Sequence, residues 1–372
     1  MTIQGAHDPR FEAVRTAFAA NLDSGDDLGA ACAVCLGGEL VVDLFGGYQD
    51  RKKEVPWARE TIVGIYSSGK AVISLLIARA VNDGLLSYDA PVADYWPDFA
   101  VAGKGEITLA QLMSHQAGLS GFPDEMDPAT WLDWGAICEK LAAMPPMWQP
   151  GNAHGYHPQT FGYLAGEVLR RVTGRTVGEL ITLHLAEPFD LDIYCGLDEG
   201  QMARASHMSK PTKLADMGEI NEPTKAAFLT KWAAPAGVSR EDWSRAEIPA
   251  SNIHADARGL ARAMSIIATD GRIDGQEFAA SSVIDLLSRE QIRGQDLVLP
   301  YEISWACGLM RNSNKVYGPV EATLGHSGFG GSCVFADREN GLSFAYVMNK
   351  MSHHLMGDPR PARLIDAVYK SL

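Results

Sequence analysis

The chain has 372 residues, of which 46% are hydrophobic, and carries a formal net charge of −14 at pH 7. This length exceeds that of most single compact domains, and we expect two lobes around a large core. No basic cluster offsets the acidic balance, which excludes nucleic acid as a partner because phosphate-binding surfaces need Lys and Arg.

No segment is long and apolar enough to span a bilayer, and residues 1–10 lack the basic and apolar regions of a signal peptide. We therefore expect a cytoplasmic protein without a membrane partner. The cysteines agree with a reducing compartment, because they are scattered rather than spaced as a disulfide framework. They stand at positions 32, 35, 138, 195, 307 and 333.

Two short patterns resemble metal or redox motifs. Cys32 and Cys35 form a C-x-x-C, but they lie in a strand-like run where residues i and i+3 point to opposite faces, so we expect core cysteines. His353 and His354 lack companion ligands, and we expect them to form an exposed pair. We predict no metal and no cofactor.

Helical and strand-like patterns open the chain. Apolar residues recur at helical spacing after Asp8-Pro9 and predict an amphipathic helix; they are Phe11, Val14, Phe18 and Leu22. Residues 30–36 and 39–45 then read as two strands joined by Gly37-Gly38, a turn that tolerates positive φ.

A strongly apolar helix follows Ser67 and is closed at Asn82-Asp83-Gly84 by a glycine C-cap. Ser67 lies at the start of this helix, where unpaired N–H groups and the helix dipole favour developing negative charge. Lys70 follows one turn later on the same face. A desolvated lysine has a lowered pKa and can take the proton of a serine, which makes the serine nucleophilic.

The middle of the chain is mostly helical. Thr108 with Gln111 and Thr176 with Glu179 are spaced as capping boxes, and a helix over residues 160–173 ends at Gly174. The stretch from 209 to 239 is rich in Lys, Pro and polar residues and is typical of a long surface loop or lid.

Strand-like runs return near the C-terminus at 332–336 and 342–348 around Asn340-Gly341, and residues 362–372 predict a closing helix. We therefore expect a discontinuous α/β sheet domain, residues 1–84 and 251–372, with a helical insertion and lid-like loop at 85–250. A cleft between the two lobes is the expected site.

Ser-x-x-Lys alone is a weak signal, since chance produces about one match in a chain of this composition. Three other segments add context: LMSHQAGL at 112–119, PGNAHGYHP at 150–158 and LGHSGFGG at 324–331. With these motifs, in this order, the chain resembles the serine β-lactamase and penicillin-binding-protein superfamily. Within it the chain is most similar to the family VIII carboxylesterases, which share the architecture of class C β-lactamases.

The resemblance implies an α/β fold, α+β in some schemes: a β-lactamase-like antiparallel sheet flanked by helices, with an inserted, mainly helical lobe. It implies that Ser67 is the acylated nucleophile, Lys70 its base partner and Tyr156 the second proton-transfer residue. It also implies that the backbone N–H groups of Ser67 and Phe329 form the oxyanion hole. A phenol near an ammonium is expected to have a lowered pKa; which group acts first stays open, because coupled groups titrate as a unit.

Two positions depart from the penicillin-recognising pattern. His326-Ser327-Gly328 stands where those enzymes have Lys-Thr-Gly, so a mostly neutral group replaces a permanent cation. Pro158 stands in place of the Asn of Tyr-x-Asn and offers no side-chain amide. Both changes favour uncharged esters. The chain also has no Gly-x-Ser-x-Gly, which excludes an α/β-hydrolase nucleophile elbow.

Several of these residues have a structural alternative. Tyr156 is either the proton-transfer residue or a packed aromatic, and His326 is either substrate-binding or structural. Phe122, Trp148 and Phe329 either line an acyl pocket or pack in the core. His115 could form a catalytic triad with Ser67, but its position between a helix and a loop favours a structural role. Trp305 is expected to pack near the cleft wall.

The leading hypothesis is a cofactor-free carboxylesterase that cleaves short-chain, small-molecule esters through an acyl-enzyme. A weak β-lactamase side activity is compatible with this hypothesis. The alternatives are an amide or β-lactam hydrolase, an acyltransferase, and a catalytically silent binding module on the same fold. Intact Ser67, Lys70 and Tyr156 argue against the last of these. The oligomeric state and the physiological ester are left open.

Overall fold

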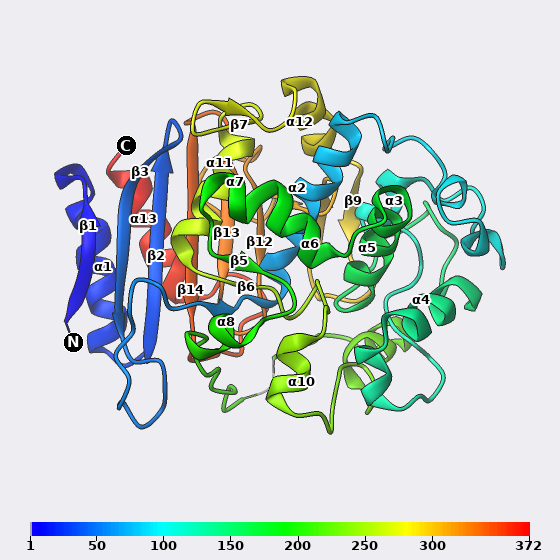
Figure 1. Ribbon diagram of the computed structural model, residues 1–372, viewed down its shortest axis with the longest axis horizontal. Helices are drawn as coiled ribbons and strands as arrows, with labels where there is room; N and C mark the ends of the chain where they lie inside the picture. Colours follow the sequence, from blue (N-terminus) through cyan, green and yellow to red (C-terminus); the bar gives the residue numbers. More distant parts are fainter. Residues whose placement is uncertain (1, 214) are drawn as a thin grey trace.

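The computed structural model describes residues 2–213 and 215–372. Within these residues, nine strands form one antiparallel sheet in the order β1-β3-β2-β14-β13-β12-β11-β10-β9 (Figure 1). Their bounds are β1 Ile3–His7, β2 Gly29–Leu36, β3 Glu39–Gly47, β9 Ile292–Gln295, β10 Glu302–Trp305, β11 Met310–Arg311, β12 Leu324–Ser327, β13 Cys333–Asp337 and β14 Leu342–Met348.

The two predicted hairpins are confirmed, and they meet in the centre of the sheet. Gly37 and Gly38 turn between β2 and β3 with φ of 60° and 87°, values that glycine adopts without strain. Strand β14 pairs with β2, placing Ala345 opposite Ala33. Segments from the two ends of the chain thus pair in the middle of the sheet, as predicted. The short edge strand β1 was not predicted.

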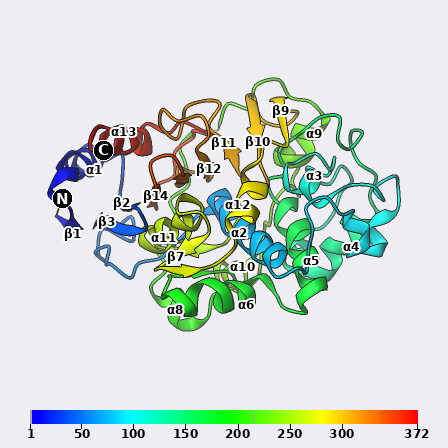
Figure 2. The same ribbon diagram turned by 90° about the horizontal axis from the view of Figure 1, so that it is seen from above.

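Helices cover both faces of the sheet. Helices α1 (Glu12–Asp23) and α13 (Pro359–Lys370) lie together on one face, and α11 (Ala257–Ala268) lies on the other, against β2, β13 and β14 (Figure 2). Cys32 is buried with the α1 and α13 side chains, and Cys35 is buried with those of α11. The C-x-x-C therefore spans two core layers, as its strand position predicts.

A mainly helical lobe packs beside the sheet. It contains α3 (Leu109–Met113), α4 (Trp134–Ala143), α5 (Thr160–Thr173) and α6 (Val177–Ile181). Both predicted capping boxes form, and α5 ends at Gly174 with φ 71°. Helix α2 (Gly69–Asn82) lies between the lobes, where it packs on α5 and on α12 (Ser281–Ser288) (Figure 1).

Shorter elements connect the lobes. They are α7 Glu187–Phe189, α8 Glu199–Ala203, α9 Glu222–Thr224, α10 Arg240–Arg245, β4 Val63–Gly64, β5 Ile193–Tyr194, β6 His254–Ala255, β7 Arg272–Ile273 and β8 Gln276–Glu277. Strand β5 lies within the predicted insertion yet pairs with β6 outside it. The domain division at 84 and 250 stays a prediction. In the part of the chain described, no helix combines the length and apolarity needed to cross a membrane.

Candidate active site

Ser67 lies in a short turn that precedes α2. Residues Tyr66–Ser68 form a 3₁₀ turn, and the α-helix itself begins at Gly69. Tyr66 has φ 48°, a left-handed conformation that is strained for an aromatic residue and is typical of functional turns. Its ring packs edge-on against Phe329, 5.9 Å between centroids, and this contact helps to hold the turn.

The Lys70 amine points at Ser67 from within α2. Its Nζ lies 3.1 Å from Ser67 Oγ and donates to the backbone oxygen of Pro158 at 2.9 Å. The side chain is fully buried, and this burial holds the pKa of Lys70 well below its usual value. The low pKa favours the neutral amine, which has a lone pair available for a proton.

Tyr156 reaches Ser67 from the loop before α5. Its phenol donates a hydrogen bond of 2.5 Å to Ser67 Oγ, and its ring stacks on Trp305 with centroids 5.9 Å apart and planes 3° apart. The expectation that its pKa is lowered is wrong, because burial raises the pKa of Tyr156 above its usual value. The neighbouring amine is itself desolvated, so it does not offset this effect, and the phenol keeps its proton.

Asp296 anchors the backbone of Tyr156, and no pattern in the sequence pointed to it. Its buried carboxylate accepts hydrogen bonds from the N–H groups of Tyr156, Val298 and Leu299 at 3.0, 2.9 and 2.9 Å. His154 Nδ1 lies 2.8 Å from the second carboxylate oxygen. One side chain after β9 thus fixes the loop that carries the phenol.

His326 is a neutral group in the site. It is fully buried, and burial lowers the pKa of His326 to about 3. Its Nδ1 lies 2.9 Å from the carbonyl oxygen of Ser327, and because a carbonyl only accepts, Nδ1 carries the single ring proton. The predicted loss of a permanent cation at this position is therefore supported by the surroundings of the ring.

His115 is part of the scaffold behind Tyr156. Its Nδ1 accepts from the His157 backbone N–H at 3.2 Å, and its ring packs on Trp305 at 4.3 Å. Burial holds its pKa well below the usual value. These contacts agree with the structural role expected from its position. Trp305 is fully buried behind the site.

The turn between β12 and β13 is tied to the Ser67 turn by side chains that the sequence did not reveal. Ser332 Oγ donates to Ile65 O at 2.7 Å and lies 2.9 Å from Ser68 Oγ. A Cβ at Gly328 would lie 2.3 Å from Ile65 O, so only glycine permits this approach. The Phe329 N–H, next along, has no hydrogen-bond acceptor among the described residues.

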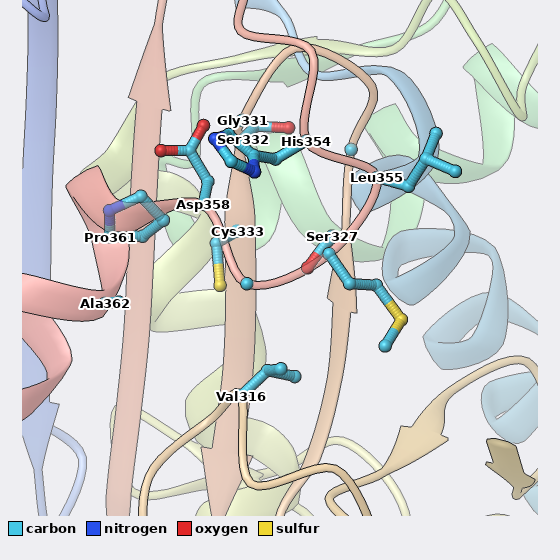
Figure 3. Close-up of a pocket in the computed structure, with 13 residues that line it drawn as sticks. Val316, Ser327, Gly331, Ser332, Cys333, His354, Leu355, Asp358, Pro361 and Ala362 are labelled. Carbon is cyan, nitrogen blue, oxygen red and sulfur yellow. The ribbon is translucent and has the colours of Figure 1, made fainter. Parts of the chain in front are cut away.

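A small cavity adjoins this turn, and its lining includes Ser327, Ser332, Cys333, Leu355 and Asp358 (Figure 3). It shares Ser327 and Leu355 with the larger cavity at Ser67. The β12–β13 turn thus lies between the small cavity and the larger cavity.

The larger cavity has a volume of about 580 Å³ and opens beside Ser67. It is lined by Tyr66, Ser67, Tyr156, Pro158, Gln159, Ala215, Asp216, Met217, Gly218, Ile220, Phe228, Leu229, Ala234, Ser251, Leu299, Met310, His326, Ser327, Phe329 and Leu355. The predicted lid segment supplies the members from 215 to 234. The lining is mostly apolar, which suits an uncharged ligand.

Phe122 and Trp148 do not line this cavity, contrary to expectation. The Phe122 ring packs on Trp131 at 5.4 Å, and Trp148 packs edge-on against His157 while its indole N–H donates to Ala153 O. Phe122 is buried in the core of the helical lobe, whereas Trp148 is half-buried and packs on the loop before α5.

Across residues 2–213 and 215–372, no group of three His, Cys, Asp or Glu side chains is arranged to hold a metal ion. His353 and His354 are half-buried rather than exposed, with ring centroids 4.4 Å apart.

The chain is similar to proteins named as esterases and to a penicillin-binding protein homolog. LipL of Mycobacterium tuberculosis, named an esterase/beta-lactamase, is 35% identical over 365 residues, covering 93% of this chain and 83% of LipL. A penicillin-binding protein homolog from Caulobacter crescentus is 51% identical with a TM-score of 0.98, and a family VIII carboxylesterase is 37% identical with a TM-score of 0.93. Both structures are covered completely, as is this chain.

The resemblance and fold class expected from the sequence are thus confirmed. The family model described as Beta-lactamase matches residues 14–368, nearly the whole chain. The chain belongs to the beta-lactamase family, and its relatives include proteins named as esterases.

Proposed function

We propose that this carboxylesterase cleaves small esters that carry no carboxylate, short acyl esters among them, through an acyl-enzyme on Ser67, and that Lys70 and Tyr156 move the protons. One observation carries the proposal: Ser67 Oγ lies 3.1 Å from Lys70 Nζ and 2.5 Å from the Tyr156 phenol, in the lining of an apolar cavity. A hydroxyl held between a proton acceptor and a proton donor is equipped for nucleophilic catalysis.

The pKa directions suggest an order for acylation. The neutral Lys70 amine accepts the Ser67 proton as Oγ bonds to the ester carbonyl carbon, and the carbonyl oxygen takes the negative charge. The N–H groups of Ser67 and Phe329 are the proposed donors to this oxyanion. The ester C–O bond then breaks, and the Tyr156 phenol protonates the departing alkoxide. The Lys70 ammonium returns its proton to the phenolate, which restores both groups.

Deacylation uses the same groups in reverse. Tyr156 and Lys70 take a proton from the attacking water, and the tetrahedral intermediate collapses to release the acid and reprotonate Ser67. Lys70 Nζ lies 4.8 Å from the centre of the Tyr156 ring, and both groups contact Ser67 Oγ. All of these steps use side chains, backbone N–H groups and water.

The preference against carboxylated esters follows from what surrounds Ser67. His326 is neutral, and Pro158 offers a backbone oxygen that already accepts from Lys70. Neither residue provides a fixed cation for a carboxylate, so a carboxylated substrate would lose its solvation without a paired charge in return. A neutral ester has no such cost.

Product analysis tests this function. Wild-type protein should convert p-nitrophenyl butyrate to butyrate, and Ser67→Ala should convert none above the buffer rate. Butyl butyrate formed in the presence of butanol would indicate acyl transfer as an additional outcome of the same acyl-enzyme. Equal turnover by Ser67→Ala and wild type would refute the assignment of the nucleophile.

A further inference from the structure

The charge around the larger cavity is unbalanced. Of the described residues that line it, Asp216 alone carries a formal charge at neutral pH, since His326 is neutral and no Lys or Arg is present. Asp216 is exposed, and its Oδ1 accepts from the Gly218 N–H at 2.9 Å, which fixes the carboxylate on its loop. No described Lys or Arg lies within ion-pair distance of it. A single carboxylate, with no ion-pair partner among the described residues, therefore lies in the lining of an apolar cavity.

Aromatic rings share the same lining. Tyr66 and Phe329 pack edge to face at 5.9 Å, and Phe329 is 42% exposed. Phe228 stacks on Tyr156, with 6.5 Å between centroids, and also lines the cavity. Aromatic faces attract organic cations, most of all alkylammonium groups, because the ring quadrupole is negative on its face.

The size of the cavity leaves room beyond the scissile ester. A volume of about 580 Å³ lies in the range of pockets that hold drug-sized ligands, far above what an acetyl or butyryl group fills. Ile220 and Leu229, 52% and 48% exposed, extend the apolar surface on the same segment as Asp216. A substrate that fills this space would meet apolar walls, aromatic rings and one carboxylate.

We propose that this cavity selects esters whose remote end carries an alkylammonium group, which Asp216 and the aromatic rings of the same lining would bind, and that it disfavours esters with a remote carboxylate. The proposal rests on the proposed ester hydrolysis at Ser67 and names the substrate class of that same site. Asp216 is in this account a specificity-determining residue and takes no part in the bond-breaking steps.

Three matched p-nitrophenyl esters test the proposal. The ester of 6-(trimethylammonio)hexanoic acid carries a cation, that of 7,7-dimethyloctanoic acid is its neutral isostere, and the monoester of adipic acid carries an anion. We expect kcat/KM to fall in the order cation, neutral, anion, with the cation about three- to tenfold above its isostere, a modest factor because Asp216 is exposed. Added salt should shrink this ratio by screening.

Two variants isolate the carboxylate. Asp216→Asn should lower the cation-to-neutral ratio at least about threefold, since only the cationic ester loses a partner. Glu219→Gln is the matched control: Glu219 is exposed on the same segment and does not line the cavity, so the ratio should stay at the wild-type value.

The experiments distinguish a failure of the proposed substrate class from a failure of the proposed ester hydrolysis at Ser67. A cation-to-neutral ratio near one in wild type, or an equal fall in Asp216→Asn and Glu219→Gln, would overturn the substrate class while ester hydrolysis stands. Turnover of the neutral ester by Ser67→Ala would instead overturn the proposed function itself.

Discussion

The phenol of Tyr156 lies 2.5 Å from Oγ of Ser67, although the two residues are 89 positions apart in the chain. The contact joins the turn before α2 to the loop before α5. The site therefore depends on how firmly each turn is anchored, as well as on the identity of its residues.

The roles of Lys70 and Tyr156 can be separated by truncation. Lys70→Ala and Tyr156→Phe should each lower kcat by about 100-fold or more, the usual scale for loss of general acid–base help. The double variant should fall well short of the product of the two losses, because groups that act as a unit are non-additive. Steady-state kinetics with p-nitrophenyl butyrate measures this. Near-normal kcat in Tyr156→Phe would remove the phenol from the mechanism.

The pH profile should follow the two shifted groups. Activity needs neutral Lys70, so kcat/KM should fall as pH drops through the lowered pKa of Lys70. Activity also needs the protonated phenol, and because burial raises the pKa of Tyr156, no decline should appear below about pH 10. His326, with a pKa of about 3, should not contribute between pH 5 and 10. A fall in kcat/KM as the pH rises from 7 to 9 would contradict these assignments.

Asp296 should prove important for both stability and rate. Asp296→Ala leaves three buried N–H groups without an acceptor, including that of Tyr156, and should destabilise the fold by about 3 kcal/mol or more. Urea unfolding measures this loss. Asp296→Asn keeps one acceptor oxygen and is the milder control; its kcat should fall more than its KM rises, because the displaced phenol acts in the chemical step. Wild-type stability in Asp296→Ala would show that the carboxylate is not an anchor.

The local features of the fold could be predicted from the sequence. A few adjacent residues determine the end of α5 at Gly174, the capping boxes and the two hairpins. The i,i+3 spacing places Lys70 next to Ser67, as expected. These signals are local, since helical and strand periodicity depend on neighbours in the chain.

The supporting contacts could not be predicted. Asp296 and Ser332 act on residues 140 and 267 positions away, and nothing in a local pattern indicates such a pairing. The pKa of Tyr156 was misjudged for a related reason: its sign depends on how completely the site is buried, which only the packed structure shows. Phe122 and Trp148 were misplaced because aromatic residues pack in cores and pockets alike.

Substrate preference gives a separate test of the neutral His326. A β-lactam would lose two oriented contacts, to the lysine and asparagine that His326 and Pro158 replace, each worth about 1 to 3 kcal/mol at a buried site. We expect kcat/KM for p-nitrophenyl acetate or butyrate to exceed that for benzylpenicillin by at least about 100-fold. Slow hydrolysis of nitrocefin is compatible with this expectation. Equal or higher values for penicillins would mean that the cavity recognises carboxylates through other groups.

The most direct test of the account is to locate the covalent intermediate. Intact-protein mass spectrometry after brief exposure to p-nitrophenyl acetate and butyrate should show one added acyl group, and peptide mapping should place it on Ser67. Ser67→Ala should stay unlabelled by these esters and by a phosphonate while it remains folded. An acyl or phosphonyl group found on any other residue, or labelling that persists in Ser67→Ala, would contradict the central claim.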